Sequence, residues 1–175
     1  MTYHGSCHAC HEGFGDHTCE VTLKVYPSYP KEPNVKQPKI IYLACPYADV
    51  DPQVLEFRFK RVTEAARLLI TIGGYLVFSP ITHAHSLQVE KHKGWGFWRN
   101  LDLPILQICG LLIIIKLPGW MHSVGVTGEV NAASIWNIPT LYIGNHEISD
   151  VAEIVKAWDY LDEFSTKDKY GTKIP

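Results

Sequence analysis

The apolar run Leu111-Leu-Ile-Ile-Ile115 and the segment Ser123-Val-Gly-Val-Thr-Gly-Glu129, which follows it closely, decide how the chain folds. A short, continuous run of branched apolar residues is typical of a strand that is buried on both faces. The small residues and two glycines after it predict a turn that opens a helix. A buried strand followed by a turn and a helix is the repeating unit of a parallel α/β sheet, in which ligands bind beyond the carboxyl ends of the strands.

The second segment carries residues suited to binding the phosphate and sugar of a nucleotide. Gly125 and Gly128 allow the backbone to approach a ligand closely, and the hydroxyl of Ser123 can donate a hydrogen bond to an oxyanion. A helix that begins here would direct its free N–H groups at a phosphate. Glu129 would then lie in about the first helical turn, where its carboxylate reaches the sugar carbons as a candidate nucleophile. The alternative is that Glu129 is an acid favoured at a helix start and that the glycines only form a turn.

Strands and helices alternate along the rest of the chain. Apolar runs predict strands over residues 40–45, 75–78, 111–115 and 140–143. Helical spacing predicts helices from about Val54 to the stop at Gly73-Gly74, over about 97–109, from Glu129 to Trp136, and over 151–164, whereas residues 81–98 are expected to be mostly irregular. This alternation predicts a doubly wound α/β fold, Rossmann-like or flavodoxin-like, with a parallel sheet of about four to five strands and helices on both faces.

Composition limits the class of protein. The chain has 175 residues, of which 46% are hydrophobic, and a formal net charge of -2. We expect one catalytic domain over residues 39–175, preceded by a Cys- and His-rich extension with a Pro-rich connector over residues 1–38. Lys and Arg are scattered rather than grouped, which argues against a nucleic-acid polymer as the partner but is compatible with a mononucleotide.

The cellular compartment is expected by default. No apolar stretch reaches the roughly 18 to 20 residues needed to span a bilayer, and the first residues lack the pattern of a signal peptide. We therefore expect no membrane partner and a cytoplasmic location. The chain has five cysteines, an odd number, and Cys45 and Cys109 lie within apolar segments. Reduced thiols fit this pattern better than a disulfide framework does.

A cluster of metal-binding residue types lies near the N-terminus. Cys7, Cys10, His11 and Cys19 offer the thiolate and imidazole ligands that a tetrahedral zinc ion takes. One Cys-x2-Cys pair with a third cysteine is compatible with a structural zinc site, and the alternative is a tail that binds no metal. Nothing in the cluster indicates a catalytic metal, and we expect that catalysis requires no cofactor.

Three acid or phenol side chains come from separate elements: Tyr42 in the first strand, Asp102 before the third strand, and Glu129 after it. With Ile41-Tyr-Leu-Ala-Cys-Pro-Tyr47, they resemble the nucleoside 2-deoxyribosyltransferase-like superfamily, and most closely its 2'-deoxynucleoside 5'-monophosphate N-glycosidase branch, over roughly residues 39–145. The family usually has a second aspartate at the start of the third strand, where this chain has Gly110.

The resemblance assigns a role to each matching residue. It implies that Glu129 is the nucleophile, that Tyr42 assists it, and that Asp102 engages the sugar or the leaving base. It further implies that the phosphate binds at Ser123 and Gly125, and that the turn with Ala44 and Pro46 contacts the substrate.

The implied reaction is hydrolysis of the N-glycosidic bond of a (deoxy)nucleoside 5'-monophosphate through a glycosyl-glutamate intermediate, which releases the free base and (deoxy)ribose 5-phosphate. A homodimer or larger homo-oligomer is implied as well. One alternative is a nucleoside 2-deoxyribosyltransferase that exchanges bases through the same intermediate. Another is a non-catalytic nucleotide-binding sensor, which the absence of an aspartate at Gly110 would permit. A third is an interaction protein that works through its Cys/His tail.

Other polar and aromatic residues have two interpretations each. His83, His85 and Trp98 are candidates for a rim around the base, because aromatic faces stack on bases and imidazoles donate hydrogen bonds to them. Solvated or capping histidines and a core tryptophan are the alternatives. Arg58 and Arg61 are candidates to assist phosphate binding, and the alternative for both is a solvated helix face.

Overall fold

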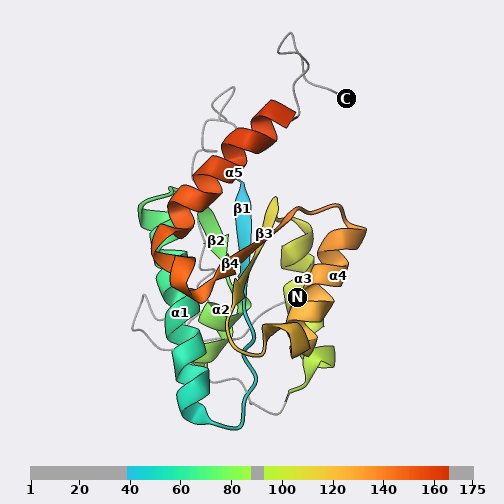
Figure 1. Ribbon diagram of the computed structural model, residues 1–175. Coiled ribbons are helices and arrows are strands. Elements are labelled where there is room, and N and C mark those ends of the chain that lie inside the picture. Colours follow the sequence, from blue (N-terminus) through green and yellow to red (C-terminus); the bar gives the residue numbers. More distant parts are fainter. Residues whose placement is uncertain (1–38, 88–92, 166–175) are drawn as a thin grey trace, which may run out of the picture. The chain divides into compact units, whose positions relative to one another are not determined.

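The computed structural model describes residues 39–87 and 93–165. In this part of the chain, strands and helices follow one another in the predicted alternation (Figure 1). The strands are β1 (Ile40–Ala44), β2 (Leu76–Phe78), β3 (Leu111–Lys116) and β4 (Thr140–Gly144). The α-helices are α1 (Pro52–Thr71), α2 (Pro80–Leu87), α3 (Trp95–Gln107), α4 (Val124–Ile135) and α5 (Val151–Ser165), and two short 3-10 helices are η1 (Trp120–His122) and η2 (Asn145–Asp150).

The four strands form one parallel sheet in the order β2-β1-β3-β4. The register pairs Tyr42 of β1 with Phe78 of β2 and with Leu112 of β3. This order is that of the flavodoxin-like doubly wound folds. The predicted fold class, including the number of strands, is therefore confirmed for the described residues.

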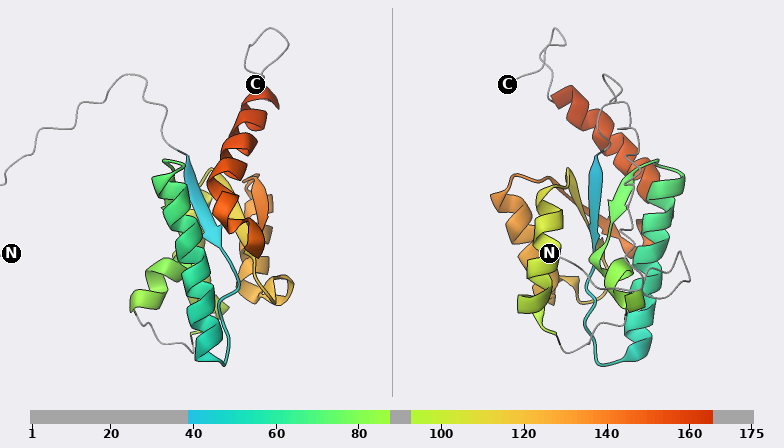
Figure 2. Two further views of the ribbon diagram at one scale, coloured as in Figure 1. Left: turned by 60° about the vertical axis from the view of Figure 1, so that its left-hand side comes forward. Right: turned by 180° about the vertical axis from the view of Figure 1, so that it is seen from behind.

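Helices cover both faces of the sheet, as Figures 1 and 2 show. On one face, Ile41 and Leu43 pack with Val62 of α1 and Val155 of α5. On the other face, Tyr42 and Ala44 pack with Leu106 of α3 and with Val126 and Ala133 of α4. Successive strand residues point to opposite faces, so this division follows from the strand geometry. Tyr42 thereby faces the two helices that carry Asp102 and Glu129.

The prediction that residues 81–98 are mostly irregular is wrong for the part that the structure describes. Pro80 begins α2, and α3 begins at Trp95. Proline suits the first position of a helix, because its φ angle is preset and its missing N–H would have no partner there. The carbonyl of Ser79 accepts bonds from the N–H of His83 at 3.1 Å and from the Thr82 hydroxyl at 3.0 Å. Ser79-Pro80 therefore ends β2 and also starts a helix.

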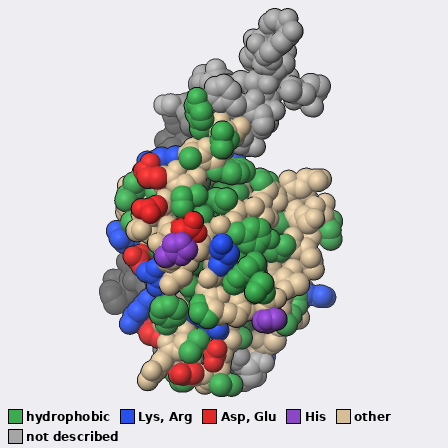
Figure 3. Space-filling view, in the orientation of Figure 1, with side chains coloured by type: hydrophobic (Ala, Val, Ile, Leu, Met, Phe, Trp, Pro, Cys, Tyr) green, Lys and Arg blue, Asp and Glu red, His purple; other side chains and the backbone are tan. Residues whose placement is uncertain are grey.

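The two sides of the visible surface differ in charge. Figure 3 shows most of the Lys, Arg, Asp and Glu side chains of this view over α1 and α5, on the left. The sequence of α4, VGVTGEVNAASI, contains one ionisable residue, Glu129, and that residue is buried. A buried carboxyl group does not contribute to solubility, so the position of Glu129 in this otherwise uncharged helix indicates another role.

A membrane-crossing helix would need about 20 apolar residues. None of the helices in the described ranges combines that length with that composition.

Candidate active site

A direct hydrogen bond joins Tyr42 to Glu129. The phenol hydroxyl of Tyr42 donates to Oε1 of Glu129 at 2.8 Å, although the two residues are 87 positions apart in the sequence. Tyr42 is 0% exposed and Glu129 is 4% exposed. Because the phenol holds Oε1, the second carboxylate oxygen of Glu129 is the candidate nucleophilic atom.

The start of α4 places Glu129. Ser123 is the N-cap of this helix, and its side chain accepts a hydrogen bond from the N–H of Val126 at 3.4 Å. Glu129 therefore lies in the second turn rather than in about the first, and no acidic residue lies in the first turn. The alternative that Glu129 is a helix-start acid is wrong, because its side chain is buried against Tyr42 and not exposed beside the helix terminus.

Burial controls the ionisation of this pair. Burial raises the pKa of Glu129 from 4.5 to about 8, the hydrogen bond from Tyr42 partly opposes this rise, and the nearby charge of Asp102 adds to it. Burial, together with the neighbouring Glu129 and Asp102, also raises the pKa of Tyr42 far above its ordinary value. At neutral pH, Tyr42 is thus a hydrogen-bond donor, and most Glu129 side chains carry a proton until a ligand changes their surroundings.

Asp102 is the second carboxyl group of the site. It lies on the buried side of α3 and is 7% exposed. Burial raises its pKa from 3.8 to about 6, and the nearby His83 lowers it. Its electrostatic influence on both Tyr42 and Glu129 shows that the three side chains share one region of the fold. The alternative that Asp102 is a surface acid of the helix is therefore wrong.

The two glycines of α4 differ in their surroundings. A Cβ atom at Gly128 would lie 2.2 Å from Cζ2 of Trp95, and one at Gly125 would lie 3.9 Å from both the Trp95 ring and Oγ of Ser123. The indole of Trp95 thus packs directly on the first turns of α4. Gly128 makes room for this indole and not for a ligand, whereas Gly125 stays close to the Ser123 hydroxyl.

Trp95 is a residue of this region that the sequence analysis does not single out. Trp95, Trp98 and Asp102 are spaced by three and four positions, which places them on one side of a helix. That spacing could have connected Trp95 to the site. Trp98 lies one turn away from Trp95, and its indole N–H donates to the Lys93 carbonyl at 3.0 Å, so the structure gives it a capping contact at the start of α3.

The two histidines of α2 point in different directions. The ring of His83 lies 6.2 Å from that of Phe78, on the side of Tyr42 and Asp102. Nδ1 of His85 instead forms a 2.7 Å hydrogen bond with the Tyr47 hydroxyl. The His85 ring also stacks on the ring of Phe59 in α1, with 3.9 Å between the ring centroids. Of the two, His83 lies beside the carboxyl groups, and His85 fastens α2 to α1.

The carboxyl end of β1 is buried beside the candidate catalytic residues. Ala44 is 1% exposed, and Pro46 is also buried. Both residues therefore shape the backbone beneath the site, and their side chains offer little surface to a ligand.

The interpretation of Arg58 as part of a solvated helix face is wrong. Arg58 is 8% exposed, and its guanidinium donates to the carbonyls of Tyr47, Ala48 and Pro118. Arg61, one turn later, donates to the side chain and the carbonyl of Asn145. These contacts use the guanidinium groups to hold loops, and they leave neither arginine arranged as a phosphate ligand.

Gly110 directly precedes β3 and so lies at the amino end of this strand, whereas the loop that carries Ser123 follows its carboxyl end. Its N–H donates to the carbonyl of Ile40 at 2.9 Å, and a Cβ atom there would lie 2.6 Å from Cγ of Lys39. A side chain at this position would begin against Lys39, before the amino end of β3. The absence of an aspartate at this position is therefore no argument that an acid is missing beside Glu129.

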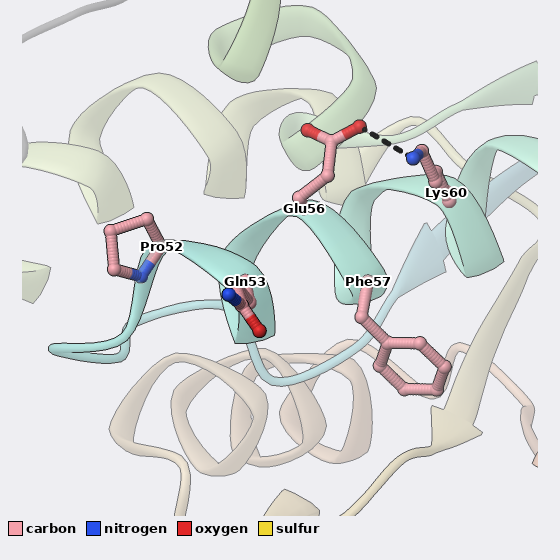
Figure 4. A pocket seen from close by; sticks show the side chains of 5 residues that line it. All are labelled: Pro52, Gln53, Glu56, Phe57 and Lys60. Carbon is pink, nitrogen blue, oxygen red and sulfur yellow. Dashed lines mark ion pairs between the residues drawn. The ribbon is translucent and has the colours of Figure 1, made fainter.

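Two cavities within the described ranges lie apart from these residues. One of about 410 Å³ is lined from α1 by Pro52, Gln53, Glu56, Phe57 and Lys60, and Figure 4 shows the ion pair between its Glu56 and Lys60. The other, of about 190 Å³, lies beside α4 and is lined by Trp120, Met121, Val126, Thr127, Val130, Asn131 and Tyr142. Neither is lined by a candidate catalytic side chain, and we assign neither to a substrate.

The predicted metal ligands Cys7, Cys10, His11 and Cys19 lie outside the described residues. Within residues 39–87 and 93–165, the structure contains no group of three or more His, Cys, Asp or Glu side chains that could hold a metal ion. The zinc interpretation of the N-terminal cluster stays a prediction.

Comparisons with known proteins give two findings. A family model described as a domain of unknown function, DUF1937, matches residues 39–143. Among solved structures, the chain is similar to a 2-desoxiribosyltransferase from Leishmania mexicana, with 20% sequence identity and a TM-score of 0.42 over 61% of this chain. The match spans 65% of the length of that protein. No curated protein matches the chain.

Proposed function

The chain belongs to the DUF1937 family, which is related to the nucleoside 2-deoxyribosyltransferases, and on this premise we propose that it hydrolyses the N-glycosidic bond of a (deoxy)nucleoside 5'-monophosphate. The relation to an enzyme family supports an enzymatic activity in general. The observation that carries the specific proposal is the buried hydrogen bond between Tyr42 and Glu129, with Asp102 in the same region. A binding protein has no need of a buried carboxyl group that is oriented by a phenol.

The reaction has two steps. Glu129 attacks C1' of the sugar through the oxygen that Tyr42 does not hold, and the bond from C1' to the base nitrogen breaks with its electron pair leaving on the base. A water molecule then adds to C1' of the glycosyl-enzyme and gives one proton to the medium, while the bond from C1' to the Glu129 oxygen breaks and returns its electron pair to the carboxylate, which releases (deoxy)ribose 5-phosphate. The departing base takes up a proton from an acid of the site or from water.

Asp102 has one of two roles in this scheme, proton donor to the base or acceptor for a sugar hydroxyl. A pKa of about 6 leaves Asp102 mostly ionised at neutral pH in the free protein. The ionised form accepts hydrogen bonds and cannot donate a proton. We therefore propose the hydroxyl-acceptor role for Asp102 near neutral pH.

Glu129 must lose its proton before it attacks. Because its pKa is raised to about 8, the reactive carboxylate is a minor species at pH 7 and becomes half of the population near pH 8. The developing positive charge on the sugar favours that carboxylate during the reaction. Assays should therefore be run at pH 8 as well as at pH 7.

The first experiment is a base-release assay. Purified protein is mixed with a panel of ribo- and deoxynucleoside 5'-monophosphates and with the matched nucleosides, and the free base is separated by chromatography. We expect release from at least one monophosphate and much slower release from its nucleoside. No release from any compound, with binding retained, would contradict the hydrolase and favour a sensor.

Base exchange is the second candidate, and the family relation favours it. Transfer and hydrolysis share the glycosyl-enzyme and differ in the acceptor, which is a second base or water. The same panel with an added acceptor base separates them. Product that appears only with the acceptor, and from nucleosides, would identify a transferase. We also propose, from the family resemblance, that the protein forms a homodimer or larger homo-oligomer.

Substitution of Ser123 tests the assignment of the phosphate site. The Ser123 hydroxyl can accept from Val126 and at the same time donate its proton to a phosphate oxygen. Ser123→Ala is expected to raise KM for the monophosphate by about tenfold or more, the value of one hydrogen bond to a charged group, and to leave the nucleoside unaffected.

The control for this variant is Ser123→Asp, which keeps a good N-cap but places a negative charge beside the phosphate. It should fold as stably as the wild type and bind the monophosphate still more weakly than Ser123→Ala does. Equal KM values for the monophosphate in all three proteins would remove Ser123 from the phosphate site.

A further inference from the structure

We propose that Arg58 is a positioning residue, which sets the geometry of the nucleotide site by tying the loop after β1 to the loop after β3. This inference rests on the proposed function for its kinetic consequence, whereas the mechanical link can be measured without any turnover. It also replaces the interpretation of Arg58 as a solvated residue, because the side chain is buried and its guanidinium donates to backbone carbonyls.

The contacts of Arg58 join two separate segments. Nη1 donates to the carbonyls of Tyr47 at 3.1 Å and Ala48 at 2.9 Å, and it lies 3.3 Å from Oδ2 of Asp49. Nη2 donates to the carbonyl of Pro118 at 3.1 Å. A planar guanidinium presents several N–H groups in a fixed arrangement, so it can hold both loops at once.

Both loops lead to the candidate catalytic residues. The first follows β1, the strand of Tyr42, and passes through the buried Pro46. The second runs through Pro118 and η1 to Ser123, the N-cap of the helix that carries Glu129. Gly119, next to Pro118, has a φ of +87°, a conformation that favours glycine, so the second loop turns sharply just where Arg58 holds it.

The buried position of Arg58 makes this link difficult to replace. With the guanidinium removed, the carbonyls of Tyr47, Ala48 and Pro118 lose a charged donor. These hydrogen bonds are partly buried, and without the guanidinium the carbonyls would turn to water, so nothing would then hold the two loops together. Lysine keeps the charge, but its compact ammonium group cannot reproduce the fork of the guanidinium.

Arg61 offers a matched comparison on the same helix. It lies three residues after Arg58, and its guanidinium donates to Oδ1 of Asn145 at 2.8 Å and to the Asn145 carbonyl at 2.6 Å. Asn145 begins η2, directly after β4, and this loop carries none of the candidate catalytic residues. Loss of Arg61 therefore removes a comparable clamp at a strand end that lies outside the proposed site.

The test compares Arg58→Gln, Arg58→Lys and Arg61→Gln by hydrogen–deuterium exchange of the full chain. We expect Arg58→Gln to increase exchange at least about tenfold in peptides covering residues 46–49 and 117–123, since their cross-link is lost. Arg61→Gln should instead increase exchange in residues 144–150 and leave 117–123 unchanged. Unchanged exchange of residues 117–123 in both Arg58 variants would overturn the proposal.

Kinetics then test the consequence for the site. Arg58→Gln should raise KM for the monophosphate by about tenfold and change KM for the matched nucleoside much less, because the loop to Ser123 is displaced. Arg58→Lys should recover part of this loss. A merely structural role would affect both substrates alike, and that outcome would also overturn the proposal.

Failure of the proposed function gives a different pattern from failure of this inference. A wild type that releases no base from any compound would refute the hydrolase, and the exchange data would still decide whether Arg58 links the loops. If Arg58→Gln does not fold, Arg58→Lys supplies the same comparison at a smaller structural change.

Discussion

Glu129→Gln is expected to lower the rate of base release by roughly a thousandfold or more, because an amide cannot form the glycosyl ester on which both steps depend. The substitution keeps the size of the side chain, and the amide oxygen can still accept the 2.8 Å hydrogen bond from Tyr42. The fold should therefore be intact. The measurement is kcat for the best monophosphate of the panel, with circular dichroism spectra of both proteins as the check on folding.

Tyr42→Phe and Asp102→Asn are the comparison variants for Glu129→Gln. Removal of the Tyr42 hydroxyl takes away the bond that opposes the rise in the pKa of Glu129, so the carboxylate should form only at higher pH and activity should move in the same direction. Asp102→Asn should reduce the rate less than Glu129→Gln does, since it does not remove the nucleophile. If Glu129→Gln kept wild-type activity, the nucleophile would have to be assigned elsewhere.

The fold could be predicted because its main signals are local. Leu111–Ile115 and the other apolar runs have strand character by themselves, and their alternation with helices restricts the topology. The α2 helix was missed for an equally local reason. Pro80 ends one element and starts the next, and a helix of only eight residues gives too few turns for the spacing of apolar residues to become visible.

The central pair of the site was expected from the resemblance, and the structure does bring Tyr42 and Glu129 together. The surrounding residues could not be derived in the same way. Arg58 looks like a solvated residue in the sequence, because helical spacing does not reveal that loops from β1 and β3 close over its guanidinium. The packing of Trp95 against Gly128 likewise depends on how α3 and α4 approach each other, which is a tertiary property.

The free energy of unfolding is expected to fall as pH rises from 5 to 8, by about 3 kcal/mol through Glu129 alone. The ordinary pKa of this carboxyl group is 4.5, and burial raises it to about 8 in the folded protein. Between these values, the folded state holds a proton that the unfolded state has released. Stability from this group is therefore full below pH 4.5 and is lost progressively as pH rises toward 8, at about 1.4 kcal/mol per pH unit.

Urea unfolding of the wild type and of Glu129→Gln at pH 5, 6, 7 and 8 isolates this contribution. The two proteins should have similar stability at pH 5, and the variant should be the more stable one at pH 8, because its buried amide never has to ionise. Asp102, with its pKa raised from 3.8 to about 6, should produce a smaller decline that is largely complete by pH 7 and persists in the variant. Both proteins have the same histidines, so the contribution of the histidines to the pH dependence cancels in the difference between the two curves. Parallel curves would mean that Glu129 is ionised in the folded protein at neutral pH, and the reactive carboxylate would then be the resting form of the site.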